Sequence, residues 1–183
     1  MKRVISSLLL VVGVLSASST DPKIKEGIRA INHFTKTVKE RLVRKVKADS
    51  KGVKAINYCS DNAIKITKSV ASMYKGVVLK RVSLQCRNTK NKPDKIDVAV
   101  LKEFKRLSKK RKKMNMKIIT TKDSYRIYKP LAITTPLCLK CHGSQRRMHP
   151  DVIKILDKKY PDDKARNFRY RQVRGAVVAI VKK

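Results

Sequence analysis

The chain has 183 residues, which suits a single domain with a substantial hydrophobic core. Hydrophobic residues make up 42% of it, a fraction that excludes a disordered polycation. The 47 lysines and arginines against 13 aspartates and glutamates give a net charge of +34, so the protein must attract polyanions, anionic membrane surfaces or acidic proteins.

The first 19 residues have the pattern of a secretory signal peptide. A basic Lys2-Arg3 pair is followed by a short apolar stretch and then by small residues. The apolar stretch is shorter than the roughly 20 residues that a membrane-spanning helix needs. We therefore expect a cleaved signal peptide over 1–19 and one domain over 20–183, in a periplasmic or secreted protein. A retained membrane anchor is the alternative.

Two long amphipathic helices are predicted next. Apolar residues recur at helical spacing over 22–48 and again over 53–75, with a polar break at 50–52. Gly76 ends the second helix, as glycine commonly does at a helix C-terminus. Cys59 falls on the apolar face of this second helix.

The remaining elements are strands with helices between them. Asp94 is placed to cap a helix that follows a polar turn, and a short helix is expected over 151–159. Segments rich in β-branched residues predict strands at 77–86, 114–121, 124–133 and 174–182. Helices followed by strands with inserted helices indicate an α+β fold.

The segment Cys138-Leu139-Lys140-Cys141-His142 is the attachment signature of a c-type haem. Two thiols three positions apart can reach the two vinyl groups at one porphyrin edge, and the next residue places an imidazole beneath the iron. A redox disulfide or a zinc half-site would use the same cysteines, but no βαβ unit surrounds them and only His149 lies near. We therefore predict one covalent haem c, held by Cys138, Cys141 and the proximal ligand His142.

Short segments in a fixed order carry a resemblance to a known family. They are residues 55–60, 81–84, 87–88, 91–94, 130–131, 138–143, 160–161 with 163 and 165, and 174–177. The chain in these segments resembles the single-haem, PAS-like c-type cytochrome domain, long catalogued as a domain of unknown function and typified by a cyanobacterial protein. The resemblance implies a PAS-like antiparallel sheet with long N-terminal helices and a haem pocket. It also implies that Cys59 is the distal iron ligand.

The residues by themselves leave the sixth iron ligand open. A cysteine on an apolar helix face is commonly only a small buried hydrophobe. In an oxidising compartment Cys59 could instead form a disulfide with Cys86. The resemblance favours Cys59 as a ligand, and a thiolate would stabilise ferric iron and give a low potential. The weaker alternatives for the ligand are His149, Met148, His33, Met114, Met116 and Cys86.

Arginines can pair with the haem propionates, because a guanidinium group forms paired hydrogen bonds with a carboxylate. Arg174 is the favoured partner, since it precedes the last strand inside one of the similar segments. Arg87 and Arg126 are alternatives. Tyr125 and Tyr128 could line the haem or belong to the core.

The predicted function is that of an exported monohaem cytochrome in redox or small-ligand sensing, with a low-potential electron carrier as the alternative. No carboxylate–histidine constellation indicates catalysis, so an enzyme is not expected. The basic run Lys105–Lys113 is most simply a solvated helix end and loop. Docking to an acidic redox or signalling protein or to an anionic membrane surface is the alternative. The run holds no aromatic residue that could stack on bases, and a nucleic-acid partner is not expected.

Overall fold

The computed structural model describes residues 21–49 and 51–183, and the predicted signal peptide at 1–19 lies outside them. The elements in chain order are α1 (Pro22–Lys47), α2 (Val53–Ala71), β1 (Val77–Val82), η1 (Thr89–Asn91), α3 (Lys95–Lys109), β2 (Lys117–Thr120), β3 (Ser124–Ala132), α4 (Pro136–His142), η2 (Gln145–Arg147), α5 (Pro150–Lys159) and β4 (Val173–Lys182). No helix within the described ranges has the length and apolarity that a membrane span requires.

The strands of the described chain form one antiparallel sheet in the order β1-β4-β3-β2. β4 lies between β1 and β3, and successive side chains along it point to opposite faces. Val177 and Ala179 pack with α1 and α2, whereas Ala176 and Val178 pack with α3. All four are fully buried because both faces are covered. The predicted α+β class with an antiparallel sheet is therefore confirmed.

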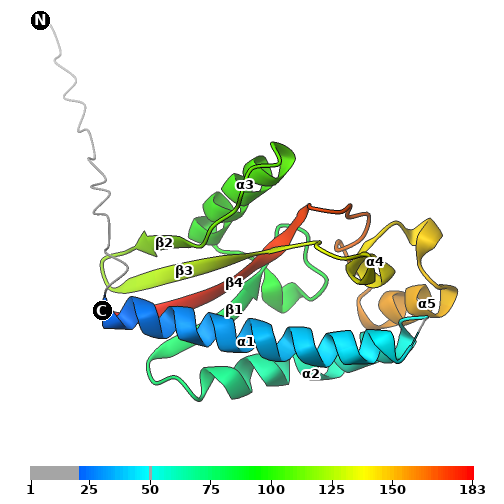
Figure 1. The fold of residues 1–183 in the computed structure, drawn as a ribbon, viewed down its shortest axis with the longest axis horizontal. Coiled ribbons are helices and arrows are strands. Elements are labelled where there is room, and N and C mark those ends of the chain that lie inside the picture. The colour runs from blue at the N-terminus through cyan, green and yellow to red at the C-terminus, as the bar shows by residue number, and fades with distance from the viewer. Residues whose placement is uncertain (1–20, 50) are drawn as a thin grey trace, which may run out of the picture.

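The long helices α1 and α2 lie side by side along one face of the sheet, and α3 covers the other face (Figure 1). Ile24, Ile31 and Phe34 of α1 are buried against the sheet, at the helical spacing that the sequence predicted. The predicted pair of N-terminal helices is confirmed, although α2 ends at Ala71 and not at 75. A turn follows, and Gly76 then takes a left-handed φ of +75°.

The N-terminus of α3 is fixed by a capping box. Asp94 accepts a hydrogen bond from the backbone N–H of Asp97, and the Asp97 carboxylate accepts one from the backbone N–H of Asp94. Asp97 is fully buried, and it also accepts hydrogen bonds from Lys80 at 2.6 Å and from the Tyr128 hydroxyl at 2.8 Å. The predicted cap at Asp94 is confirmed, and its network ties α3 to β1 and β3.

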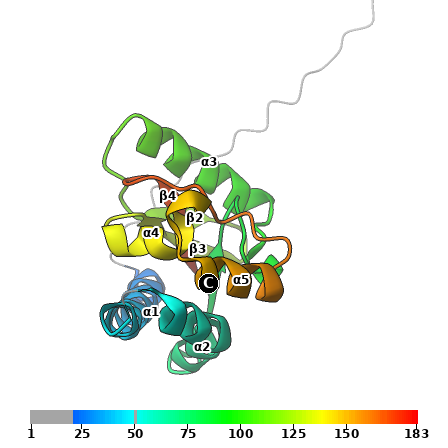
Figure 2. The ribbon, with the colours of Figure 1, turned by 90° about the vertical axis from the view of Figure 1, so that its right-hand side faces the viewer.

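The short helices α4 and α5 lie together at one end of the sheet, beside the point where α1 gives way to α2 (Figure 2). Val152 and Leu156 of α5 are buried against Ile56 of α2. On the other side of α4, Ile133, Ala165 and Phe168 form a small cluster that contacts Cys138 and Leu139. The C-terminal third of the chain thus wraps around the helix that carries the motif.

The main differences from the predicted elements occur at this end of the molecule. β1 stops at Val82 and not at 86, because the Ser83 hydroxyl accepts a hydrogen bond from the Gln85 backbone and donates to the Arg174 carbonyl. β2 begins at Lys117 and not at 114. The seven-residue helix α4 was not predicted, since two turns are too short to produce a recognisable apolar period.

Candidate cofactor site

All three motif residues lie on α4. The helix begins with Pro136 at its first position, where a missing N–H costs nothing, and ends at His142. Cys141 and His142 follow Cys138 by three and four positions, so each of them is a neighbour of Cys138 on the helix surface. A Cβ on Gly143 would lie 2.6 Å from the backbone oxygen of Leu139, so only glycine allows the chain to turn there.

The His142 imidazole is oriented by a backbone carbonyl. Its Nδ1 lies 2.9 Å from the oxygen of Ala165, which can only accept, so Nδ1 carries the proton and donates it. The Arg174 Nε lies 3.4 Å from the same nitrogen, but it can make no hydrogen bond to a nitrogen that is protonated. Nε2 is consequently left unprotonated, which is the form that binds a metal.

The pKa of His142 lies well below its ordinary value. Burial of the ring is the main cause, and the positive charges of Arg174 and Arg87 add to it. The imidazole is therefore neutral near pH 7, as a metal ligand must be.

Arg174 lies behind the imidazole, on its Nδ1 side. Its Nη1 donates to the Ser83 hydroxyl at 2.6 Å and to the Gln85 carbonyl at 3.0 Å, and its guanidinium carbon is 5.4 Å from the centre of the Phe168 ring. Burial lowers the pKa of Arg174 to about 10, so it stays charged at neutral pH. The structure confirms that Arg174 lies next to the motif. Its pairing with a propionate stays a prediction, because its hydrogen bonds go to protein oxygens.

Arg87 joins the loop after β1 to the motif helix. Its guanidinium donates to the Cys141 carbonyl at 2.5 Å, to the Ala165 carbonyl at 3.3 Å and to the Asp163 carboxylate at 3.2 Å. Asp163 is 1% exposed and also accepts from Arg166 at 2.9 Å. The charge of Arg87 is the largest of the effects that lower the pKa of Asp163, which outweigh its burial. Sequence reasoning named Arg87 but missed Asp163, although both fall in the segments that carry the resemblance.

Cys59 of α2 lies close to Cys141 of the motif. The thiol is partly buried, and burial together with the nearby Cys141 raises the pKa of Cys59 to about 11. The positive charges of Arg81 and Arg87 lower the pKa of Cys59, so both arginines also lie close to this thiol. α2 and α4 therefore bring Cys59 and the haem-attachment motif together, as the resemblance implied.

Arg81 of β1 is a site residue that sequence reasoning did not single out. Partial burial lowers the pKa of Arg81, and the nearby Cys59 and Tyr160 side chains raise it. The guanidinium makes no hydrogen bond or ion pair with any residue of 21–49 or 51–183. Arg81 is half-buried, and a partly desolvated cation without a carboxylate in the described chain fits a site that receives an anionic group from elsewhere.

The other residues proposed for the site lie elsewhere. Arg126 pairs with Asp94 at 2.6 Å and Tyr128 donates to Asp97, both on the α3 face. Tyr125 lies at the opposite end of β3, beside Asp21. The structure does not bring these three side chains to the motif.

The other residues considered as iron ligands make hydrogen bonds or packing contacts of their own. The Cys86 thiol donates to the Ser83 and Asn91 carbonyls at 3.0 and 3.2 Å, and neither Cys59 nor Cys86 is in a disulfide. His149 caps α5, with its Nδ1 accepting from the Asp151 N–H. Met148 is buried in the α5 cluster, His33 contacts Tyr74 at 3.1 Å, and Met114 and Met116 pack against the two sheet clusters.

The donor set fits the covalent haem that the motif predicts. Two thiols and an unprotonated Nε2 are carried by one short helix, a third thiol lies close to Cys141, and a half-buried guanidinium has no carboxylate partner in the described chain. A zinc site finds less support, since no group of three or more histidine, cysteine or acidic residues gathers anywhere in residues 21–49 and 51–183.

Known proteins that are similar to this chain include a haem protein. No curated protein matches the chain. Among solved structures it is similar to the cyanobacterial haem protein Tll0287, with a TM-score of 0.57 and 25% sequence identity over 68% of this chain and 71% of that one. The Tll0287-like family model matches residues 17–181, nearly the whole chain. The chain therefore belongs to the Tll0287-like family.

Proposed function

We propose that this protein is a monohaem c-type cytochrome domain. Cys138 and Cys141 would form the two thioether bonds, and Nε2 of His142 would be the proximal iron ligand. The observation that carries the proposal is the 2.9 Å hydrogen bond from His142 Nδ1 to the Ala165 carbonyl, which fixes the tautomer that a metal requires. The similar solved structure is titled a haem protein, which supports the same conclusion.

Cys59 is the proposed distal ligand. It lies close to Cys141 of the motif, and the raised pKa of its thiol means that a bound thiolate must be compensated by iron and by the nearby guanidinium groups of Arg81 and Arg87. Haem held in this way supplies a one-electron centre whose ferric state is favoured by the thiolate. Because protonation competes with ligation, a change of oxidation state or pH would release Cys59 and open the iron to a small ligand.

We assign the partnerless Arg81 to the haem propionates, ahead of Arg174. Arg81 lies near Cys59 and Tyr160 with no carboxylate partner in the described chain, whereas Arg174 is already bonded to Ser83 and Gln85. A propionate beside Arg81 would neutralise a half-buried charge that the described chain leaves without a partner.

The proposed role is redox or small-ligand sensing without catalysis, in a periplasmic or secreted protein whose residues 1–19 direct export. An electron carrier is the second candidate. It is favoured by the basic run Lys105–Lys113, whose cations at the end of α3 and in the following turn are exposed and could dock on an acidic protein or an anionic membrane surface.

A denaturing gel stained for haem peroxidase activity tests the proposal. The protein would be expressed with and without the host's cytochrome maturation machinery. Haem should stay with the wild-type band and be lost from Cys138→Ala/Cys141→Ala. A wild-type band without stain under working maturation would refute the proposal.

The distal ligand is tested by absorption spectra of the wild type and Cys59→Ser in both oxidation states. The ferric spectrum of the variant should lose its thiolate character, whereas Cys86→Ser should match the wild type. Identical ferric spectra of the wild type and Cys59→Ser would exclude Cys59. Binding of CO to the ferrous form favours sensing, and fast, salt-dependent electron exchange with an acidic protein favours the carrier.

A further inference from the structure

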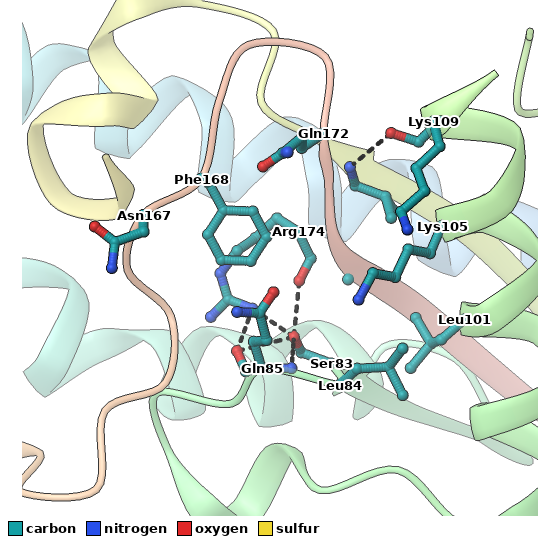
Figure 3. A pocket seen from close by; sticks show the side chains of 13 residues that line it. Ser83, Leu84, Gln85, Leu101, Lys105, Lys109, Asn167, Phe168, Gln172 and Arg174 are labelled. Atoms are coloured by element: carbon teal, nitrogen blue, oxygen red, sulfur yellow. Dashed lines mark hydrogen bonds between the residues drawn. The ribbon is translucent and has the colours of Figure 1, made fainter. Parts of the chain in front are cut away.

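A cavity of about 240 Å³ lies between α3 and the chain segment that leads into β4 (Figure 3). Lys105 and Lys109 of α3 form one wall, and Phe168 and Arg174 form the opposite wall. Its full lining is Ser83, Leu84, Gln85, Leu101, Lys105, Ser108, Lys109, Asn167, Phe168, Gln172, Val173, Arg174 and Gly175. No acidic residue is among them.

The cavity carries unneutralised positive charge. Lys105 and Lys109 make no ion pair with any residue in the described part of the chain, and Figure 3 shows both side chains directed toward the cavity. The acidic residue of α3 nearest to them, Glu103, pairs instead with Lys117 of β2. Arg174 adds a third cation. Because it is partly desolvated, its positive charge is costly, and a nearby anion would reduce that cost.

Neutral donors complete the lining. The Gln172 side-chain oxygen accepts from the Arg169 backbone N–H at 2.8 Å, which leaves its NH₂ group available to donate. Asn167 lines the same wall with a left-handed φ of +62°, a conformation that asparagine tolerates better than most residues. The hydroxyls of Ser83 and Ser108 are already used within the protein. The ammonium groups of Lys105 and Lys109 and the NH₂ group of Gln172 are therefore available to an anion.

We propose that this cavity binds a small oxyanion, a phosphate or a short carboxylate, and that Arg174 couples its occupancy to His142. Lys105 and Lys109 supply charge from α3, and the side-chain amide of Gln172 can donate from the other wall. Arg174, whose Nη1 is bonded to Ser83 and Gln85, contributes its positive charge. The volume suits an ion or a molecule of a few heavy atoms, since drug-sized ligands occupy larger clefts.

The cavity lies on the far side of the imidazole from the metal-binding nitrogen. Arg174 and Phe168 line it, and both contact His142: the Arg174 Nε is 3.4 Å from Nδ1, and the Phe168 ring stands edge-on at 6.3 Å between centres. Nε2 points away from this wall. The site is therefore distinct from the one where haem would bind.

The coupling rests on the proposed function, whereas anion binding does not. An anion beside Arg174 would offset a positive charge close to His142, and this favours the ferric over the ferrous state. By linkage the oxidised protein would bind the anion more tightly than the reduced one. A tenfold difference in affinity corresponds to a fall of about 59 mV in the midpoint potential on saturation.

Calorimetric titration of the purified full-length protein with inorganic phosphate, at constant ionic strength, tests the site. Lys105→Gln/Lys109→Gln should weaken binding at least tenfold. Lys102→Gln/Arg106→Gln removes the same charge from other exposed positions of α3 and should change binding less than twofold. Equal losses in the two variants, or no saturable binding by the wild type, would overturn the proposal. Parallel titrations with succinate and with uncharged glycerol separate phosphate from carboxylate and from non-ionic binding.

Redox titration with and without phosphate tests the coupling. The potential of the wild type should fall with phosphate, and that of Lys105→Gln/Lys109→Gln should not respond. Binding without any change in potential would overturn the coupling. If the haem stain fails, calorimetry still decides whether the anion site exists. Phosphate bound only by the haem-free variant Cys138→Ala/Cys141→Ala would overturn the site as well, because propionates would then fill it.

Discussion

The imidazole of His142 donates from Nδ1 to the backbone carbonyl of Ala165, a residue 23 positions later in the chain. The guanidinium of Arg87 links the same two segments, because it donates to the carbonyls of Cys141, which precedes His142, and of Ala165. Arg87 is in turn fixed by the buried carboxylate of Asp163. The orientation of the proposed proximal ligand thus depends on a residue of the loop after β1.

Arg87→Met should lower the free energy of unfolding by about 3 kcal/mol, since it leaves Asp163 with one of its two charge partners, removes the side-chain donor of the Cys141 carbonyl, and leaves the Ala165 carbonyl with His142 as its side-chain donor. Arg166→Met is the matched control. Arg166 pairs with the same carboxylate but with neither carbonyl, so its loss should cost clearly less. Urea denaturation measures both. Equal losses would show that only the charge pair matters and that the carbonyl contacts do not contribute.

The haem-free, reduced protein should lose stability between about pH 9 and pH 11 through Cys59. Burial raises the pKa of this thiol from 9.0 to about 11, so the folded state holds its proton after the unfolded chain has released it. The stabilising effect is complete below the unfolded pKa and disappears as the pH rises through the folded one. The contribution of Cys59 to the free energy of unfolding amounts to about 2 kcal/mol after allowance for partial exposure.

Urea denaturation of the wild type and Cys59→Ser at pH 8 and pH 11 measures this contribution. The stability difference between the two proteins should shrink as the pH rises, while the shared titration of lysines and tyrosines cancels. A difference that is the same at both pH values would contradict the raised pKa of the Cys59 thiol.

Local sequence signals were sufficient for most of the fold. Helix α1 was predicted within one residue at its C-terminus because its apolar period runs over many turns, and the start of α3 followed from Asp94. The last strand was recognised because buried β-branched residues fill it. Each of these signals depends only on neighbours in the chain.

Contacts between residues that are far apart in the chain could not be predicted from such local signals. Arg87 and Asp163 are 76 positions apart, and no pattern in either segment predicts that their side chains form an ion pair. Arg81 belongs to a strand whose alternation does not reveal which partner its side chain faces. The motif therefore gave the chemistry of the site, while the second layer of charges around it had to come from the three-dimensional structure.

Arg81→Met should shift the pH at which the haem-loaded ferric protein loses its Cys59 ligand. Arg81 stabilises the thiolate by proximity, so its removal should raise the midpoint of this spectral transition by roughly one pH unit. Arg81→Lys keeps the charge and should recover most of the shift. Arg126→Met removes a guanidinium that is paired with Asp94 away from the motif and should leave the midpoint unchanged. A shift of the same size in Arg126→Met would mean that net charge, and not position, controls the ligand.

The approach of α1 to the sheet depends on Gly27. A Cβ at this position would lie 2.7 Å from the Ile127 Cδ1 and 3.0 Å from the Val181 Cγ2. Gly27→Ala should therefore destabilise the protein by about 1 kcal/mol, because overpacking costs about 1 to 3 kcal/mol and alanine regains nearly 1 kcal/mol of helix propensity.

The double variant Gly27→Ala/Ile127→Val isolates the clash, since valine lacks the Cδ1 that the new methyl group would meet. Ile127→Val alone should cost about 1 kcal/mol for the lost methylene. The double variant should be more stable than the sum of the single losses predicts, by about 1 kcal/mol of coupling. Thermal or urea unfolding of the four proteins completes the cycle. Strict additivity would show that α1 moves away from β3 to admit the methyl group, and that the tight contact at Gly27 does not fix the helix on the sheet.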